Sequence, residues 1–249
     1  MKKVIIIGAT SGIGKGLAIL YANNGWNVGI TGRRAPLLND VRQMFPSQIF
    51  TSCFDITASN NLQLIDDLIH QMDGIDLFIY SSGIGELSTQ PNWEIDERVI
   101  ATNVTAATKC CGHVFNYFVE KGSGQIAIIS SIAAVRGGSS APSYNASKAF
   151  VSSYAESLNL QAIALQKDII ITDVKPGFVN TSMAKGEGKF WVMPVDKICH
   201  QIYRAIQAKK RKVVVSKRWR VITFLMAIMP DFLFIELTKR MAAKRQPLA

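Results

Sequence analysis

The first 21 residues constrain the fold most strongly, because they combine a buried strand, a glycine-rich turn and a helix. Val4–Ile7 is a continuous apolar run rich in β-branched residues, as expected of a strand covered on both faces. Residues 8–14 read GATSGIG, and Leu17, Ala18 and Tyr21 then recur at helical spacing. Such a turn can hold a pyrophosphate on the free N–H groups of the helix. A tight strand-to-helix turn without a ligand is the alternative interpretation.

Six further apolar segments alternate with helical patterns along the chain. We expect strands at residues 28–31, 48–54, 76–80, 125–129, 169–174 and 213–215. This alternation predicts one α/β domain of the Rossmann type, with a doubly wound parallel sheet and right-handed crossovers. The length of 249 residues suits one sizeable core. We expect a catalytic domain over residues 1–215 and a basic, apolar helical extension over residues 216–249.

Residues 130–148 carry the groups best suited to proton transfer. Ser130 and Ser131 follow the fifth predicted strand, at the end where open α/β sheets bind ligands. Tyr144 and Lys148 lie four residues apart and therefore share one face of a helix. A neighbouring ammonium favours the phenolate, which predicts a Tyr144 pKa below its usual value of about 10. Such a tyrosine can exchange a proton in carbonyl or alcohol chemistry, although chance spacing is the alternative.

The second predicted strand ends in Gly32-Arg33-Arg34. In nicotinamide-binding folds an acidic residue at this point binds the ribose 2′-hydroxyl, whereas arginine accommodates a 2′-phosphate. This chain has two arginines there and no acid, which favours NADP(H) over NAD(H). A solvated basic turn is the alternative interpretation.

These features together resemble the short-chain dehydrogenase/reductase family from Lys3 to about Val215. The matching residues are Gly8-x-x-x-Gly12-x-Gly14, Asp55, Asn103, Ser131, Tyr144-x-x-x-Lys148 and Pro176-Gly177. The resemblance implies an NAD(P)(H)-linked oxidoreductase that interconverts a carbonyl and a secondary alcohol. The chain departs from the family at residues 80–83, where Tyr-Ser-Ser-Gly replaces the usual Asn-Asn-Ala-Gly and its sheet-bracing asparagine.

The resemblance also implies a role for each matching residue. Tyr144 is the general acid for carbonyl reduction and the base for alcohol oxidation, and Ser131 holds the substrate oxygen. Lys148 binds the nicotinamide ribose and lowers the Tyr144 pKa, while Asn103 anchors a water that links Lys148 to solvent. The implied coenzyme-binding residues are Gly8, Thr10, Ser11, Gly12, Ile13, Gly14, Arg33, Arg34, Asp55, Ile56, Tyr144, Lys148, Pro176, Gly177, Val179 and Thr181.

Residues 178–194 resemble the substrate lid of the family. They include Met183, Phe190, Trp191 and Met193, which favours a lipid-like, steroid-like or aromatic substrate over a polar one. The resemblance further implies a homodimer or homotetramer. A non-catalytic NADP(H)-binding redox sensor that docks through its C-terminal tail is the alternative function. The complete catalytic set argues against it, because binding alone needs no activated phenol.

Positive charge is concentrated at the C-terminus. Residues 209–249 contain 11 of the 28 Lys and Arg residues but 2 of the 18 Asp and Glu residues, so they hold +9 of the net charge of +10. No recognised nucleic-acid-binding module accompanies this charge. The four cysteines lack metal-ligand spacing and two of them are adjacent, which predicts no metal site and a reducing cytoplasm.

The apolar segments of the tail leave three interpretations open. The run 221–229 is too short to span a bilayer, which needs roughly 20 apolar residues. Asp231 and Glu236 argue against a longer spanning segment. The tail can therefore cap the substrate pocket, form a subunit contact, or make peripheral contact with an anionic membrane through residues 217–245.

Overall fold

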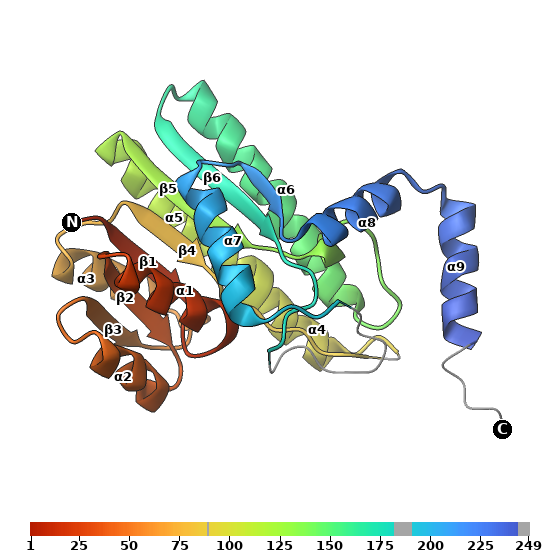
Figure 1. Ribbon diagram of the computed structural model, residues 1–249, viewed down its shortest axis with the longest axis horizontal. Helices are drawn as coiled ribbons and strands as arrows, with labels where there is room; N and C mark the ends of the chain where they lie inside the picture. The colour runs from red at the N-terminus through yellow and green to blue at the C-terminus, as the bar shows by residue number, and fades with distance from the viewer. Residues whose placement is uncertain (89, 182–190, 244–249) are drawn as a thin grey trace.

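A seven-stranded parallel sheet forms the centre of the protein (Figure 1). The structure is a computed structural model that describes residues 1–88, 90–181 and 191–243. The strand order is β3-β2-β1-β4-β5-β6-β7. The strands are β1 (Lys3–Ile7), β2 (Asn27–Gly32), β3 (Ile49–Cys53), β4 (Leu77–Tyr80), β5 (Ser123–Ile129), β6 (Asp168–Lys175) and β7 (Lys212–Val214). All the predicted strands are present, and the predicted Rossmann-type sheet is confirmed.

Helices cover both faces of this sheet and form one domain with it. α1, α2 and α7 lie on one face, and α3, α5 and α6 lie on the other. The helices are α1 (Gly12–Asn23), α2 (Ala35–Met44), α3 (Asn61–Gln71), α4 (Trp93–Ile100), α5 (Ala106–Lys121), α6 (Pro142–Ala164), α7 (Val195–Gln207), α8 (Lys217–Ile228) and α9 (Asp231–Ala243). A π-helical turn over Ala101–Thr105 joins α4 to α5.

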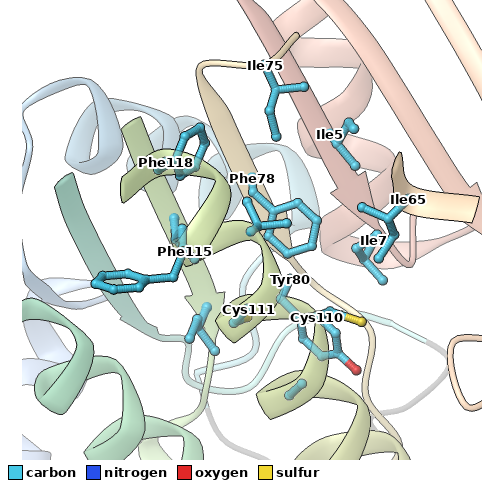
Figure 2. Close-up of a cluster of buried hydrophobic side chains, with 14 of the residues drawn as sticks. Ile5, Ile7, Ile65, Ile75, Phe78, Tyr80, Cys110, Cys111, Phe115 and Phe118 are labelled. Atoms are coloured by element: carbon cyan, nitrogen blue, oxygen red, sulfur yellow. The ribbon is translucent and has the colours of Figure 1, made fainter. Parts of the chain in front are cut away.

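Two apolar cores explain why the strands are apolar throughout. Val4 and Ile6 of β1 pack against α1, α2 and α7, whereas Ile5 and Ile7 point to the opposite core. Figure 2 shows this second core, in which Phe78 lies between β1 and the side chains of α5. Burying each such side chain contributes roughly 1.5–3 kcal/mol. The central strands therefore lack the alternation of apolar and polar residues that a half-exposed sheet shows.

The strand order reverses between β1 and β4, and the loops after these two strands meet there. Gly8 adopts a φ of +83°, and a Cβ at this position would lie 2.8 Å from the Cα atom of Ser82. The Ser81 N–H donates a hydrogen bond to the Ile7 carbonyl (3.0 Å). The Tyr80 hydroxyl donates one to the Thr102 carbonyl (2.7 Å). Backbone pairing and small side chains thus join these loops in place of the family's asparagine, at the switch point where such sheets bind ligands.

The C-terminal helices extend beyond one end of the sheet (Figure 1). α8 anchors itself through buried Trp219 and Thr223, whereas the described side chains of α9 are exposed or half-buried. Among the described residues, no single helix is long and apolar enough to cross a membrane. α8 and residues 231–240 satisfy that test only together, with a bend of 119° between them.

Candidate active site

Tyr144 and Lys148 lie in the first two turns of α6, on the side of the helix that faces β5. The Lys148 Nζ atom donates a hydrogen bond to the Ile129 carbonyl (2.9 Å) at the end of β5. The same atom lies 5.7 Å from the centre of the Tyr144 ring. The structure therefore brings together the pair that the sequence placed on one helix face.

The two serines after β5 point in different directions. Ser131 lies near enough to Tyr144 for its hydroxyl to lower the pKa of the phenol, and its Oγ atom accepts a hydrogen bond from the Ala133 N–H (3.1 Å). Ser130 instead donates to the Asp173 carboxylate and to the Val174 carbonyl (3.0 Å) on β6. Side-chain chemistry alone left both serines open as the partner of Tyr144. The structure places Ser131 beside the phenol.

Asn103 lies in the π-helical turn, an irregularity that the sequence did not predict and that is frequent at functional sites. Its amide bonds to both backbone groups of Ile84 at 2.8 and 2.9 Å, and it donates to the Ser147 Oγ atom (3.0 Å). A Cβ at Gly83 would lie 3.2 Å from Lys148 Nζ and 3.3 Å from Asn103 Oδ1. Asn103 thus fixes the loop after β4 against α6 beside Lys148, and its role in a water relay stays a prediction.

The pKa of Tyr144 corrects one expectation. Burial raises this pKa above its usual value of 10.0, and the Ser131 hydroxyl only partly offsets that effect. The prediction of a lowered pKa is therefore wrong, because desolvation outweighs the effect of the nearby hydroxyl. Burial likewise lowers the pKa of Lys148 to about 8, although the negative charge of Asp173 acts in the opposite direction.

The glycines of the turn allow close packing that a side chain would prevent. A Cβ at Gly14 would overlap the Gly8 carbonyl, and one at Gly12 would lie 3.2 Å from Cγ2 of Thr181. Within the described chain, the N-cap residue Ser11 makes no side-chain capping bond to α1. A cleft of about 610 Å³ runs between α1 and α7 and includes Ser11 and Thr181, whereas the proposed catalytic residues do not line it.

The two arginines after β2 make different contacts. Arg34 donates hydrogen bonds to the hydroxyls of Thr10 (2.6 Å) and Ser11 (3.1 Å), which holds the glycine-rich turn. Arg33 has a side chain that is 69% exposed and lies 3.4 Å from the Asp55 carboxylate. Partial burial by itself raises the pKa of Asp55, but hydrogen bonds from Thr57 and the charge of Arg33 bring it below its usual value.

The other predicted coenzyme residues support the site from beneath. Ile56 is buried in the core of Figure 2, and Val179 is buried in the core on the opposite face of the sheet. Ile13 packs against the same core as Val179. The Pro176 carbonyl accepts a hydrogen bond from the Ile132 N–H (3.0 Å) and so ties the loop after β6 to the Ser131 loop. The contacts of these residues with the coenzyme stay predictions.

Comparison with known proteins decides the family. Residues 2–190 match the sequence model of the short chain dehydrogenases. The chain belongs to the short-chain dehydrogenase family. An uncharacterized oxidoreductase of Myxococcus xanthus (strain DK1622) is 32% identical over 188 residues, which cover 73% of this chain and 74% of that protein.

Two further relatives of this short-chain dehydrogenase cover more of its length. The 11-beta-hydroxysteroid dehydrogenase 1A of Arabidopsis thaliana is 26% identical over 258 aligned residues, covering 92% of this chain and 72% of the relative. The solved structure of a short-chain dehydrogenase from Sphingobium yanoikuyae in complex with NADPH has the same fold. Its TM-score is 0.78 at 23% identity, and the match covers 93% of this chain and 97% of that one.

Two residues of this short-chain dehydrogenase support the site without having been predicted. A Cβ at Gly85 would lie 2.9 Å from Cδ2 of Tyr144, so the loop after β4 packs directly on the phenol ring. Asn145 donates hydrogen bonds to the carbonyls of Ala133 (3.1 Å) and Arg136 (3.0 Å), which holds the Ser131 loop against α6. The repeated glycines at positions 83 and 85 were a usable signal for Gly85, whereas no local pattern indicated the role of Asn145.

The C-terminal extension reaches the edge of the site through Trp219. A Cβ at Gly177 would overlap the Trp219 ring, and the ring centre lies 5.4 Å from that of Phe178 and 6.2 Å from that of Trp191. Arg218 lies over the Trp191 ring at 5.5 Å. The predicted lid residues Met183 and Phe190 lie outside the described residues. α8 therefore packs on the loop after β6, and the three interpretations of the tail stay predictions.

Proposed function

We propose that this short-chain dehydrogenase is an NADP(H)-dependent oxidoreductase that interconverts a hydrophobic carbonyl compound and its secondary alcohol. The cluster of Ser131, Tyr144 and Lys148 carries the proposal. It places a hydroxyl, a phenol and an ammonium together at the carboxyl edge of the sheet, beside a glycine-rich turn. Those are the groups needed to bind a carbonyl oxygen and to exchange a proton with it.

The residues around the turn fit a phosphorylated dinucleotide. Gly14 packs against the Gly8 carbonyl and so keeps the turn tight at the start of α1, where N–H groups and the helix dipole would favour an anion. Arg33 and Arg34 would hold a 2′-phosphate at the end of β2. When bound, NADP(H) supplies or accepts the hydride. The NADPH complex of the structural relative supports this choice of coenzyme.

The protein's own residues would supply the proton. Because burial raises the pKa of Tyr144, its phenol stays protonated at neutral pH and is ready to donate to a carbonyl oxygen. Ser131 would hold that oxygen beside the phenol, and the Lys148 ammonium would stabilise the phenolate that forms on proton transfer. In alcohol oxidation the same phenolate is the base. Lys148 would also bind the nicotinamide ribose.

The walls of the site favour an apolar substrate. Phe178, Trp191 and Trp219 form an aromatic cluster where the extension meets the loop after β6. Apolar walls with few polar groups suit a hydrophobic ligand. The name of the Arabidopsis relative, a hydroxysteroid dehydrogenase, supports a substrate of this class.

Coenzyme binding and turnover test this function together. NADPH oxidation would be followed with a panel of apolar ketones and 3-oxoacyl thioesters, for the wild type and Tyr144→Phe. We expect turnover by the wild type, a loss of roughly 10²–10⁴-fold in the variant, and the same NADPH affinity in both. The rival sensor function predicts NADPH binding without turnover, and wild-type protein inactive across the panel would contradict the proposal.

We also propose that α8 and α9 attach the enzyme to an anionic membrane surface. The exposed apolar side chains on the two helices are Val221, Phe224, Leu225, Ile228, Phe232, Leu233, Ile235 and Leu237. Basic residues flank them at 217–220 and 239–240. The five Lys and Arg residues in these flanks outnumber the two acidic residues, of which Asp231 pairs with Arg136 and Glu236 with Arg240, so the net charge of this surface is positive. Apolar side chains with basic flanks suit anionic lipid.

Flotation with phosphatidylcholine vesicles, with and without phosphatidylserine, tests this attachment. We expect flotation that requires phosphatidylserine and is lost in Phe224→Glu/Phe232→Glu. Leu160→Glu is a matched control, because Leu160 is an exposed apolar side chain on α6. Equal flotation with and without phosphatidylserine would contradict attachment to an anionic membrane surface. So would a double variant that floats like the wild type and differs from it only in self-association. The predicted homodimer or homotetramer and the domain boundary at residue 215 stay predictions.

A further inference from the structure

Strand β6 carries two charged residues in the protein interior. Asp173 is 2% exposed and Lys175 is 7% exposed, in a strand whose Ile171 and Val174 are fully buried. Their side chains form an ion pair beneath α6. Because a buried carboxylate is costly unless charge and hydrogen bonds compensate it, this pair calls for a role beyond packing.

Asp173 joins the two elements that carry the proposed catalytic groups. Its Oδ1 atom accepts a hydrogen bond from Ser130, which immediately precedes Ser131 at the end of β5. Its Oδ2 atom accepts hydrogen bonds from Ser152 of α6 (2.7 Å) and from Lys175. One carboxylate therefore connects β5, β6 and α6 directly below the site.

One face of helix α6 carries polar side chains, and one of them contacts the Asp173 carboxylate. Tyr144, Lys148 and Ser152 follow one another at intervals of four residues and so share one face of the helix. Further along α6, Asn159 exchanges hydrogen bonds with both backbone groups of Ile171 at 2.6 and 3.0 Å. These polar contacts fix α6 against β6, and Ser152 places Asp173 one helical turn from Lys148.

The described surroundings of Lys148 contain few charges. On α6 itself the neighbouring titratable group is Tyr144, and β6 contributes Asp173 and Lys175. From β5 the contact is the Ile129 carbonyl, and from the π-helical turn it is the neutral amide of Asn103. Asp173 is therefore the one negative charge among these groups, and Lys175 is the positive charge that competes for it.

We propose that Asp173 is a positioning residue for Lys148, which it holds as an ammonium beside Tyr144 while Lys175 limits the strength of its field. The proposal rests on the proposed function, in which Lys148 acts as a cation. It predicts that variants of Asp173 and Lys175 shift the pH at which Lys148 loses its proton in opposite directions. Removing the carboxylate lowers the pH at which Lys148 loses its proton. Removing the Lys175 ammonium leaves the carboxylate uncompensated and raises that pH.

The titration of Lys148 can be followed without substrate or coenzyme. In protein labelled with ¹³C at lysine Cε, the NMR signal that disappears in Lys148→Met identifies the residue. We expect a wild-type midpoint near pH 8, a midpoint roughly one unit lower in Asp173→Asn, and a higher one in Lys175→Met. The double variant Asp173→Asn/Lys175→Met leaves no unpaired buried charge, and its midpoint should fall between those of the single variants.

Ser152→Ala is the matched control, because it removes one hydrogen bond to Asp173 and one from Lys175 without changing a charge. It should lower the melting temperature while leaving the Lys148 midpoint in place. Folded Asp173→Asn and Lys175→Met proteins whose midpoints move in the same direction, or stay at the wild-type value, would overturn the proposal. The alkaline limb of kcat/KM should shift with the NMR midpoint. Because NMR needs no turnover, an inactive wild type would contradict the proposed function alone.

Discussion

The indole ring of Trp219 in α8 packs directly against the backbone of Gly177, at the loop that follows β6. A side chain at residue 177 would overlap that ring. The C-terminal extension is therefore built onto the loop that carries the Pro176-Gly177 motif. Glycine at this position leaves room for a tryptophan from the same chain.

Gly177→Ala tests that contact. The added methyl group should displace Trp219 and with it α8, lowering the free energy of unfolding by roughly 1–3 kcal/mol. Urea denaturation followed by tryptophan fluorescence measures the change. Gly137→Ala is the control, because a Cβ there meets no atom within 4 Å among the described residues. Equal stability of the two variants would contradict the packing argument.

The contacts of Arg33 and Arg34 predict coenzyme selectivity. Arg33→Ala should weaken NADPH binding by about tenfold while leaving NADH binding unchanged, because only NADPH carries the 2′-phosphate. Arg34→Ala should weaken the binding of both, since Arg34 also holds Thr10 and Ser11. Calorimetric titration measures the affinities. Arg42→Ala, at an exposed position on α2, should change neither, and an Arg33→Ala protein that retained its preference for NADPH would contradict this assignment.

The buried position of Lys148 makes folding stability depend on pH. Its pKa is about 8 in the folded protein, against 10.5 for a free lysine, so the unfolded chain binds more protons between these values. Wild-type stability from this group therefore rises with pH across that window. If Lys148→Met is more stable than the wild type at pH 7, that advantage should shrink by roughly 3 kcal/mol once the pH exceeds the window. Denaturation at several pH values measures the free energy of unfolding, with Lys210→Met at an exposed position as the control. The same pH dependence in the wild type and both variants would contradict this prediction.

The contact between Gly85 and the Tyr144 ring predicts that a substitution at Gly85 lowers kcat without weakening NADPH binding. A methyl group at this position would press on the Tyr144 ring and turn the phenol away from Ser131. Gly85→Ala should therefore lower kcat by roughly ten- to a hundredfold, since small misplacements of a reacting group are costly. NADPH affinity should change little. Steady-state kinetics and coenzyme titration check both statements, and unchanged kcat would show that the loop can move aside.

Arg136 holds the junction of α8 and α9. It donates a hydrogen bond to the Met229 carbonyl (2.8 Å), pairs with Asp231 (3.0 Å) and lies over the Phe234 ring at 4.7 Å. Arg136→Ala should speed hydrogen exchange throughout α9 while exchange in the sheet stays slow. Arg240→Ala breaks an exposed pair within α9 and should cost less than about 0.5 kcal/mol. Equal exchange in both variants would contradict this anchoring role.

The strands and the glycine-rich turn could be predicted because their signals are local. Apolar runs such as Val4–Ile7 indicate a strand wherever they lie, and Gly8 must take a positive φ to begin the turn. The pairing of Tyr144 with Lys148 could be predicted too, since both lie on one helix. The direction of the Tyr144 pKa could not, because it depends on how much water the rest of the fold excludes.

By itself the sequence determined the order of the elements, the family and the residues available for proton transfer. Only the tertiary structure decided that Asp173 joins Ser130 to Ser152 and that Trp219 covers Gly177. Each of these contacts joins residues that are well separated along the chain. Spacing within one element reports which side chains share a face, whereas the packing of elements decides which faces meet.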